Sequence, residues 1–240
     1  MATASWYRTG IVTEEEIKQT SPQRSGPRDW RFWLKEGDKR NLAFLDGTDD
    51  GFRIKEHDFE INGKWGNTFT CRDGLDFDEK GVRLPCPLCS LADARGRKGA
   101  AYIISFFTIV DLTPWKDKNG QEHPYFVKML GVKKETLAKI KMIREANGGS
   151  LVGHKFLVMR SKPVVAEGDK RSKTPRVGDI WQPLGLTDVT QFKMGKENKP
   201  AAPFDYTKLL EPKTLDELKK FASDLGAGVA TTSEAEEVPY

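Results

Sequence analysis

The chain has 240 residues, 38% of them hydrophobic and 31% charged, and its formal net charge is +4 at pH 7. Its longest apolar run, residues 101–112, is too short to cross a bilayer, and its first residues lack the basic and apolar segments of a secretory signal. Three cysteines are too few for a disulfide scaffold and indicate a reducing compartment. The composition therefore predicts a soluble, cytoplasmic protein with no membrane partner.

Charge is distributed unevenly along the sequence. Residues 211–240 contain three lysines and seven acidic residues, a net charge of −4, so that residues 1–210 carry +8. A basic body with an acidic end is the polarity expected of a protein that binds a polyanion and whose tail competes for the same groove. Ordinary surface charge with a solvated tail would give the same count, so the charge alone leaves both interpretations open.

The first part of the chain predicts an arm, a hairpin and an irregular segment. Residues 1–29 show little periodicity and end in a Ser-, Pro- and Arg-rich stretch, which is typical of a flexible arm. Residues 30–34 and 40–45 alternate between apolar and polar side chains on either side of a turn at 36–39, a pattern that predicts a β-hairpin. Residues 52–90 contain every cysteine, are rich in Gly and Asp, and are expected to be irregular.

The middle of the chain predicts further strands and one helix. Residues 101–112 form a nearly continuous β-prone run, which indicates a central strand buried on both faces. After an Asn-Gly turn, residues 125–130 can return as its partner. Residues 134–147 have helical apolar spacing and end before a pair of glycines, which predicts an amphipathic helix. Residues 155–160 and 177–184 predict two more strands.

The C-terminal part predicts a helix followed by a tail. Thr214 and Glu217 form a capping box that opens a helix within residues 211–226, and residues 227–240 are expected to be a disordered acidic tail. Several strands with one intervening helix favour a small closed barrel over a parallel sheet. The predicted fold of residues 30–210 is therefore mainly β with minor α, an OB-fold-like barrel.

The strongest pattern in the sequence is H-x13-C-x14-C-x2-C, formed by His57, Cys71, Cys86 and Cys89. One histidine and three cysteines are a donor set suited to one tetrahedral Zn²⁺, and the pattern uses every cysteine of the chain. The segment around them has too few apolar residues to fold by burial, so a bound metal would supply the missing stability. The sequence therefore predicts one structural zinc in a subdomain at residues 57–89, inserted in the barrel.

Two alternatives to this structural zinc site remain open. His123 is the main rival of His57 as the fourth ligand, whereas His154 opens a predicted strand and is expected to pack or to face solvent. A catalytic zinc would resemble that of nucleobase deaminases, which combine H-x-E with P-C-x-x-C and use the Glu as general acid and base. Here Phe59 occupies the position of that Glu, and Glu60 is one residue too far along. We therefore predict that the protein is not an enzyme.

Aromatic and basic residues are interleaved in a way that suits single-stranded nucleic acid. Arg31, Trp33 and Lys35 share one face of the first predicted strand, and Phe126 and Lys128 repeat the theme on a later one. A ring can stack on a base while the flanking cations meet phosphates, although a place in the core is the competing interpretation for each ring. The candidate nucleic-acid contacts are Arg31, Trp33, Lys35, Arg40, Trp65, Phe126, Lys128, Arg160, Lys162, Lys170, Arg171, Lys173 and Arg176.

The sequence ends in a compact candidate recognition peptide. Its members are Glu236, Glu237, Val238, Pro239 and Tyr240. The terminal ring and carboxylate can enter one pocket of a partner protein while the acidic side chains meet a basic rim. The alternative is an ordinary frayed terminus.

The set of His57, Cys71, Cys86 and Cys89 within a β-rich, aromatic and basic core resembles the single-stranded DNA-binding proteins of tailed phages, best known from the T-even phages. Residues 31–47 are similar to the general layout of that family, and the last residues resemble the acidic ending of bacterial single-stranded DNA-binding proteins. The resemblance implies an OB-fold with an inserted zinc subdomain and a tail that recruits replication and repair partners. It also implies that the protein works in the cytoplasm of the host cell.

The expected function is therefore that of a phage protein that coats and protects single-stranded DNA in DNA replication, recombination and repair. Its binding would be independent of sequence and sensitive to salt, because phosphate neutralisation and base stacking are both indifferent to base identity. The predicted partners are single-stranded DNA, replication and recombination proteins bound through the tail, and further copies of the chain on DNA. The alternative is a zinc-containing transcription or replication adaptor that binds duplex DNA or a polymerase.

Overall fold

The computed structural model describes residues 30–47, 51–61, 64–116, 120–162, 174–194 and 199–230, without the side chains of 64–66 and 226–230. The predicted arm and the acidic recognition peptide lie outside the described residues. The chain divides into two compact units, of which unit 1 comprises Ile54–Ile103 and the part from Leu210 on. Unit 2 comprises Ile104–Leu209 and the residues that precede Ile54.

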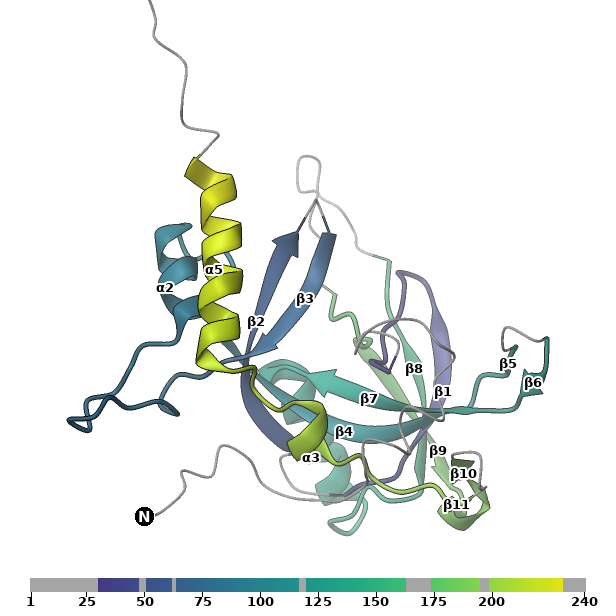
Figure 1. Ribbon diagram of the computed structural model, residues 1–240. Coiled ribbons are helices and arrows are strands. Elements are labelled where there is room, and N and C mark those ends of the chain that lie inside the picture. The colour runs from purple at the N-terminus through teal and green to yellow at the C-terminus, as the bar shows by residue number, and fades with distance from the viewer. Residues whose placement is uncertain are drawn as a thin grey trace, which may run out of the picture. The chain divides into compact units, whose positions relative to one another are not determined.

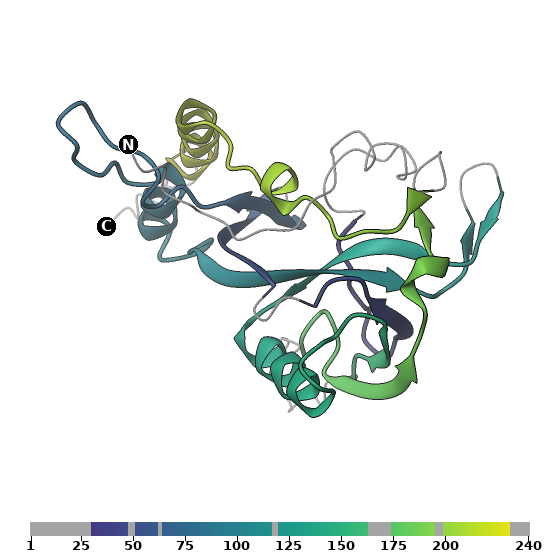
Figure 2. The same cartoon turned by 90° about the horizontal axis from the view of Figure 1, so that it is seen from below.

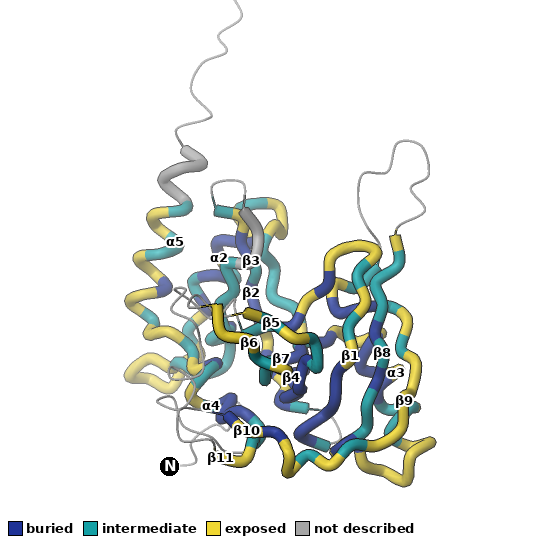
Figure 3. The backbone as a smooth tube through the Cα atoms, turned by 90° about the vertical axis from the view of Figure 1, so that its right-hand side faces the viewer, coloured by how far each residue is buried: buried dark blue, intermediate teal, exposed yellow. Residues whose placement is uncertain are grey.

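The central strand of unit 2 is β4 (Tyr102–Asp111). It pairs antiparallel with β1 (Lys39–Phe44) along one edge and with β7 (Phe126–Val132) along the other. The eight residues from Ile104 to Asp111 are all buried, which Figure 3 shows as the dark blue course of β4. The sequence-based predictions of a doubly buried central strand and of its returning partner are both confirmed.

Two further strands extend unit 2 beyond β1. β8 (His154–Met159) pairs with β1, and β9 (Ile180–Leu186) pairs with β8, both antiparallel. Within the described residues β9 does not pair with β7, so no closed barrel forms, and the prediction of an OB-fold-like barrel was wrong. β9 is exposed at six of its seven residues, and so it lacks the buried face that a closing strand needs. The prediction of a mainly β chain with a few helices is confirmed.

Residues 30–35 do not form the predicted hairpin with β1. They run parallel to β7 instead, where Met129 donates its N–H to the Trp30 carbonyl at 2.6 Å and Phe32 donates to the Met129 carbonyl at 2.8 Å. The reason is that β4 and β8 already occupy both edges of β1, which leaves no edge for a hairpin partner. The predicted alternation survives, because Phe32 is buried and Trp33 is exposed.

α3 (Lys134–Ala146) forms where the sequence predicts it and covers one side of the strands of unit 2 (Figure 2). Leu137 and Ile140 pack into the core cluster that includes Phe44. The helix ends at the predicted glycine pair, where Gly149, with φ of +87°, donates its N–H to the Arg144 carbonyl at 3.0 Å. The shorter elements of unit 2 are β5 (Trp115–Lys116), β6 (Glu122–His123), η1 (Val189–Gln191), β10 (Lys193–Met194), β11 (Lys199–Pro200) and α4 (Tyr206–Leu209).

Unit 1 contains an antiparallel hairpin of β2 (Phe52–Ile61) and β3 (Lys64–Thr70), followed by α2 (Pro87–Ala94). The two strands replace part of the segment expected to be irregular, because the first half of β2 alternates between buried and exposed residues like a strand. α5 (Leu215–Ala230) lies beside α2 (Figure 1) and continues past the predicted end at residue 226. No helix in the described part of the chain is long and apolar enough to cross a membrane.

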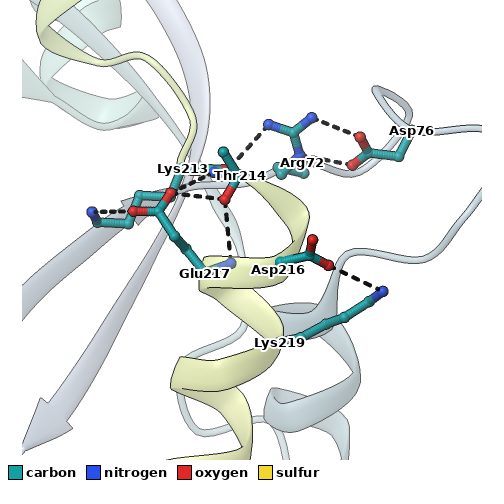
Figure 4. Close-up of polar contacts among 7 residues, drawn as sticks. All are labelled: Arg72, Asp76, Lys213, Thr214, Asp216, Glu217 and Lys219. Carbon is teal, nitrogen blue, oxygen red and sulfur yellow. Dashed lines mark hydrogen bonds and ion pairs between the residues drawn. The ribbon is translucent and has the colours of Figure 1, made fainter.

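The start of α5 confirms the predicted capping box. Glu217 Oε2 accepts the Thr214 N–H at 2.8 Å, and Thr214 Oγ1 accepts the Glu217 N–H at 3.3 Å (Figure 4). The two side chains thereby satisfy donors that a helix start leaves unpaired.

A buried polar cluster holds the segment around α4 within unit 2. Asp46 Oδ2 accepts the Thr108 N–H at 2.6 Å and the Tyr206 O–H at 3.4 Å, and Phe204 donates its N–H to Thr108 Oγ1 at 2.9 Å. Burial raises the pKa of Asp46 to about 6, although the hydrogen bonds from Thr108 and Tyr206 lower it.

This raised pKa predicts a pH dependence of stability. Because the folded pKa lies above the ordinary value of about 3.9, protonated Asp46 stabilises the fold, and this contribution is lost as the pH rises through 6. The loss between pH 5 and 7.5 amounts to about 1.4 kcal/mol. Asn does not titrate, so Asp46→Asn should not lose this contribution. The unfolding free energy of the variant minus that of the wild type should therefore rise by about that amount between pH 5 and 7.5, as measured by urea unfolding. A difference that stays constant with pH would contradict the assignment.

Candidate metal centre

The four predicted metal ligands come together in unit 1. His57 lies in β2, Cys71 directly follows β3, Cys86 immediately precedes α2 and Cys89 lies in the first turn of that helix. Their ligand atoms all lie within 4.8 Å of one another. The Sγ atoms of Cys71 and Cys89 are 3.7 Å apart, and His57 Nε2 is 3.8 Å from Cys86 Sγ and 3.6 Å from Cys89 Sγ. These residues form a group that could hold one metal ion.

Local backbone structure fixes where the three cysteines lie. Cys71 donates its N–H to the Lys55 carbonyl at 2.9 Å, which extends the β2–β3 ladder by one residue. Pro87 occupies the first turn of α2, where its missing N–H costs nothing. The Cys86 carbonyl accepts the Cys89 N–H at 3.0 Å, so the start of the helix sets the separation between the last two cysteines.

The orientation of the His57 ring is set by Gly99. The imidazole is fully buried, and its Nδ1 lies 2.8 Å from the Gly99 carbonyl oxygen. Since a carbonyl can only accept a hydrogen bond, Nδ1 carries the proton and Nε2 presents its lone pair to the sulfur atoms. Gly99 has φ of +85°, and a Cβ on this residue would collide with the Phe59 ring. The ring of Phe59 also stacks on the imidazole, with 5.8 Å between the centroids.

The electrostatics of the three thiols favour a bound cation. A hydrogen bond from the Cys71 thiol lowers the pKa of Cys86, and the same bond raises the pKa of Cys71 well above its usual range. Burial raises the pKa of Cys89. Without a cation, therefore, only one of the three sulfur atoms readily carries a negative charge. A divalent metal ion would stabilise all three as thiolates, and so the chemistry of the donor set fits a metal.

The unit that surrounds these ligands extends beyond the predicted segment of residues 57–89. Phe59 and Leu88 share a small buried cluster with Leu218, which belongs to α5 and lies far away in the sequence. Arg72 adds a polar link, because its guanidinium binds both carboxylate oxygens of Asp76 at 2.6–2.7 Å and donates to the Lys213 carbonyl at 3.0 Å (Figure 4). The C-terminal helix is thus part of the metal-site unit.

The rival histidines lie away from the cluster. The ring of His123 stacks on Trp115 in unit 2, with 4.5 Å between the centroids, and His154 opens β8. Phe59 has no carboxylate, and Glu60 is exposed, so neither residue places a carboxylate beside the buried sulfur atoms. Among the described residues, the group that could hold a metal is the one predicted from the sequence.

Four of the predicted nucleic-acid contacts gather at one place on unit 2, here called the Trp33 patch: Trp33, Lys35, Lys162 and Arg176. All four are exposed, and Trp33 is 56% exposed. Leu34, between the first two, donates its N–H to the Arg176 carbonyl at 2.7 Å. The Lys162 side chain passes over Gly37, since a Cβ on that glycine would lie 3.0 Å from Lys162 Cε.

Other predicted contacts are engaged within unit 2. The Arg31 guanidinium lies over the Phe106 ring at 5.0 Å from its centroid, and Lys128 Nζ pairs with Asp111 at 2.8 Å. Phe126 packs its ring edge-on against the indole of Trp115 in β5.

Two predicted arginines lie close to β8, and the remaining candidates cannot be placed. Arg40 is half-buried in β1, opposite Val158 of β8, and Arg160 directs its guanidinium into the protein. The Trp65 side chain lies outside the described residues, as do three members of the basic loop, Lys170, Arg171 and Lys173.

Sequence reasoning missed Gly99 and α5 as parts of the metal-site unit. The hydrogen bond from His57 to Gly99 spans 42 residues of sequence, and the glycine itself signals only a turn. The helical pattern of α5 was visible, but its packing against α2 was not.

Comparisons with protein families, with curated proteins and with solved structures found no match.

We expect the purified protein to contain about one metal ion per chain, and Cys86→Ser to lose it. Because a bound metal would replace a large apolar core in unit 1, the melting temperature of the variant should fall by about 10 °C or more. Elemental analysis and thermal unfolding measure the two effects, with Ser90→Ala, an exposed change in the same helix, as the control. A metal-free wild type with an equally stable Cys86→Ser variant would rule out the metal centre.

A second variant tests the support of His57. Gly99→Ala should weaken metal binding by about 10–100-fold, because its Cβ collides with Phe59 and displaces the carbonyl that orients the imidazole. Gly96→Ala is the matched control, since Gly96 also has positive φ, of +62°, but would place its Cβ in open space. Competition with a chelator gives both affinities. Equal losses in the two variants would show that backbone strain, and not the support of His57, accounts for the effect.

Proposed function

We propose that this protein binds single-stranded DNA without sequence preference and protects it during the replication, recombination and repair of a phage genome. The observation that supports this proposal best is the Trp33 patch, where the exposed residues Trp33, Lys35, Lys162 and Arg176 lie on segments that contact one another. The sequence resemblance to phage single-stranded DNA-binding proteins supports it independently.

The physical basis of this binding is stacking combined with phosphate neutralisation. Trp33 offers an indole face to an unpaired base, and each base has a π-face that can stack on it. The neighbouring cations neutralise phosphates and release counterions, which makes the affinity fall steeply with salt. In a duplex the bases are paired and stacked on one another and cannot reach the ring, so a single strand is preferred.

For the metal centre we propose a structural Zn²⁺. Zinc–sulfur bonds of about 2.3 Å and zinc–nitrogen bonds of about 2.0–2.1 Å at tetrahedral angles give S···S edges of about 3.8 Å and S···N edges of about 3.6 Å. Three of the six separations, 3.7 Å between Cys71 and Cys89 sulfur atoms and 3.6–3.8 Å between His57 Nε2 and two sulfur atoms, match these edges, and all six are within 4.8 Å. Four protein donors leave no open position for a substrate, which supports a structural role. The element found by metal analysis tests this assignment.

The acidic end of the chain belongs to the same proposal. It would recruit replication and recombination proteins, and in their absence it would compete with DNA for the basic surface. Copies of the chain bound side by side on one strand would complete the coat.

The experiment is a titration of tryptophan fluorescence with oligo(dT) and with a duplex of equal length, at low and high salt. We expect strong quenching by the single strand, a weak response to the duplex and a steep loss of affinity with salt. Trp33→Ala should lower the affinity for oligo(dT) about tenfold and remove much of the quenching. The control is Phe77→Ala, because Phe77 is an aromatic ring of matching exposure, 55%, in unit 1.

Two outcomes would count against the proposal. Equal or tighter binding to the duplex would favour the zinc-containing adaptor that the sequence left as the alternative. Equal effects of Trp33→Ala and Phe77→Ala on the affinity for oligo(dT) would show that the Trp33 patch is not part of the binding surface.

A further inference from the structure

We infer that Arg160 is a positioning residue of the Trp33 patch and not the phosphate contact that its charge predicts. The inference rests on the proposed function, since it assigns a role within the same binding surface. Arg160 directly follows β8 and lies at the start of the connection to β9. Its side chain is only 12% exposed, which is unusual for a basic residue that meets a ligand at the surface.

The guanidinium of Arg160 is used inside the protein. Nη1 donates to the Leu34 carbonyl at 2.9 Å, and Nη2 donates to Glu36 Oε1 at 3.2 Å. Nε donates to Thr174 Oγ1 at 3.3 Å. One planar group therefore joins the segment that carries Trp33 to the far end of the β8–β9 connection.

The backbone of Arg160 strengthens the same junction. Its carbonyl accepts the Gly37 N–H at 2.8 Å, and its N–H donates to the Asp38 carbonyl at 3.0 Å. The Leu34 N–H donates to the Arg176 carbonyl, so the two sides of the junction also meet directly. Arg160 thus lies at the centre of the contacts that hold Trp33, Lys35 and Arg176 in one patch.

The geometry requires arginine at this position. The three acceptors lie in different directions around the guanidinium, and its rigid fork of five N–H donors can serve all of them at once. A lysine ammonium is a single point on a flexible stem, and it cannot reach the Leu34 carbonyl and Thr174 Oγ1 together. The charge of Arg160 is also partly neutralised by Glu36, which leaves little attraction for a phosphate.

The consequence for binding follows from the exposure of Trp33. Because Trp33 is 56% exposed, packing fixes its ring less than it fixes a buried one, and the direction of the ring depends more on the backbone that carries it. Leu34 is the next residue, and both its N–H and its carbonyl are held at this junction. Loss of the guanidinium should therefore misplace the ring without changing the number of phosphates that the protein neutralises.

Arg160→Lys and Arg160→Gln test this role in oligo(dT) titrations at several salt concentrations. Both variants should lose about tenfold in affinity, although only the second loses the charge. The slope of log affinity against log salt should remain that of the wild type in both. Arg176→Gln is the control for a phosphate contact, and it should reduce the slope by about 0.7, the value expected for one contact to a single strand.

A double variant tests whether Arg160 acts through Trp33. If it does, Arg160→Lys should have almost no further effect once Trp33→Ala is present, because the two losses share one cause. Thr174→Val provides a milder change for the case in which the arginine variants do not fold. It removes one acceptor of the guanidinium without altering charge, and it should lower the affinity with an unchanged salt slope.

The results that overturn the inference are distinct from those that overturn the proposed function. Wild-type affinity in Arg160→Lys would show that Arg160 acts through its charge, as a phosphate contact does. A slope of log affinity against log salt that is reduced by about 0.7 in Arg160→Gln would show the same. Additive losses of affinity in the double variant would show that Arg160 does not act through Trp33. A wild-type protein that does not bind oligo(dT) would overturn both the inference and the proposed function.

Discussion

Three sulfur atoms and an imidazole nitrogen within 4.8 Å of one another form the constraint on which unit 1 depends. They come from a strand, a loop after a strand and the start of a helix, and burial opposes the ionisation of neighbouring thiols that no cation neutralises. The apolar cluster around them is small and needs α5 to complete it. A bound metal would thus do in unit 1 what apolar burial around the strand β4 does in unit 2.

Unit 2 arranges its exposed residues by a different means. Trp33 faces water, and its place is set by hydrogen bonds to the backbone around it and by the guanidinium of Arg160. A ring that is held by the main chain can offer its face to a ligand without first giving up contacts in the core. Rigid backbone support also reduces the ordering cost that a freely moving side chain would pay on binding.

Local patterns predicted much of this structure, and long-range contacts account for most of what they missed. The central strand, α3, the capping box of α5 and the four ligands could be read from spacing, because each depends on neighbours in the sequence or on residue chemistry. The hairpin at residues 30–45 could not, since its outcome depended on β8 taking the second edge of β1. The contacts of Arg160 could not be read from spacing either, because its three acceptors belong to two other segments of the chain.

The discontinuous construction of unit 1 has a consequence during synthesis. Its strands and α2 leave the ribosome long before α5, because the whole of residues 104–209 is translated in between. During that interval Leu88 and Leu91 of α2 lack the cover of Leu218, and an uncovered apolar face invites aggregation. An ion captured by the nascent chain would hold β2, β3 and α2 together until the helix arrives. The supply of metal to the translating cell would then set the yield of folded protein as well as its stability.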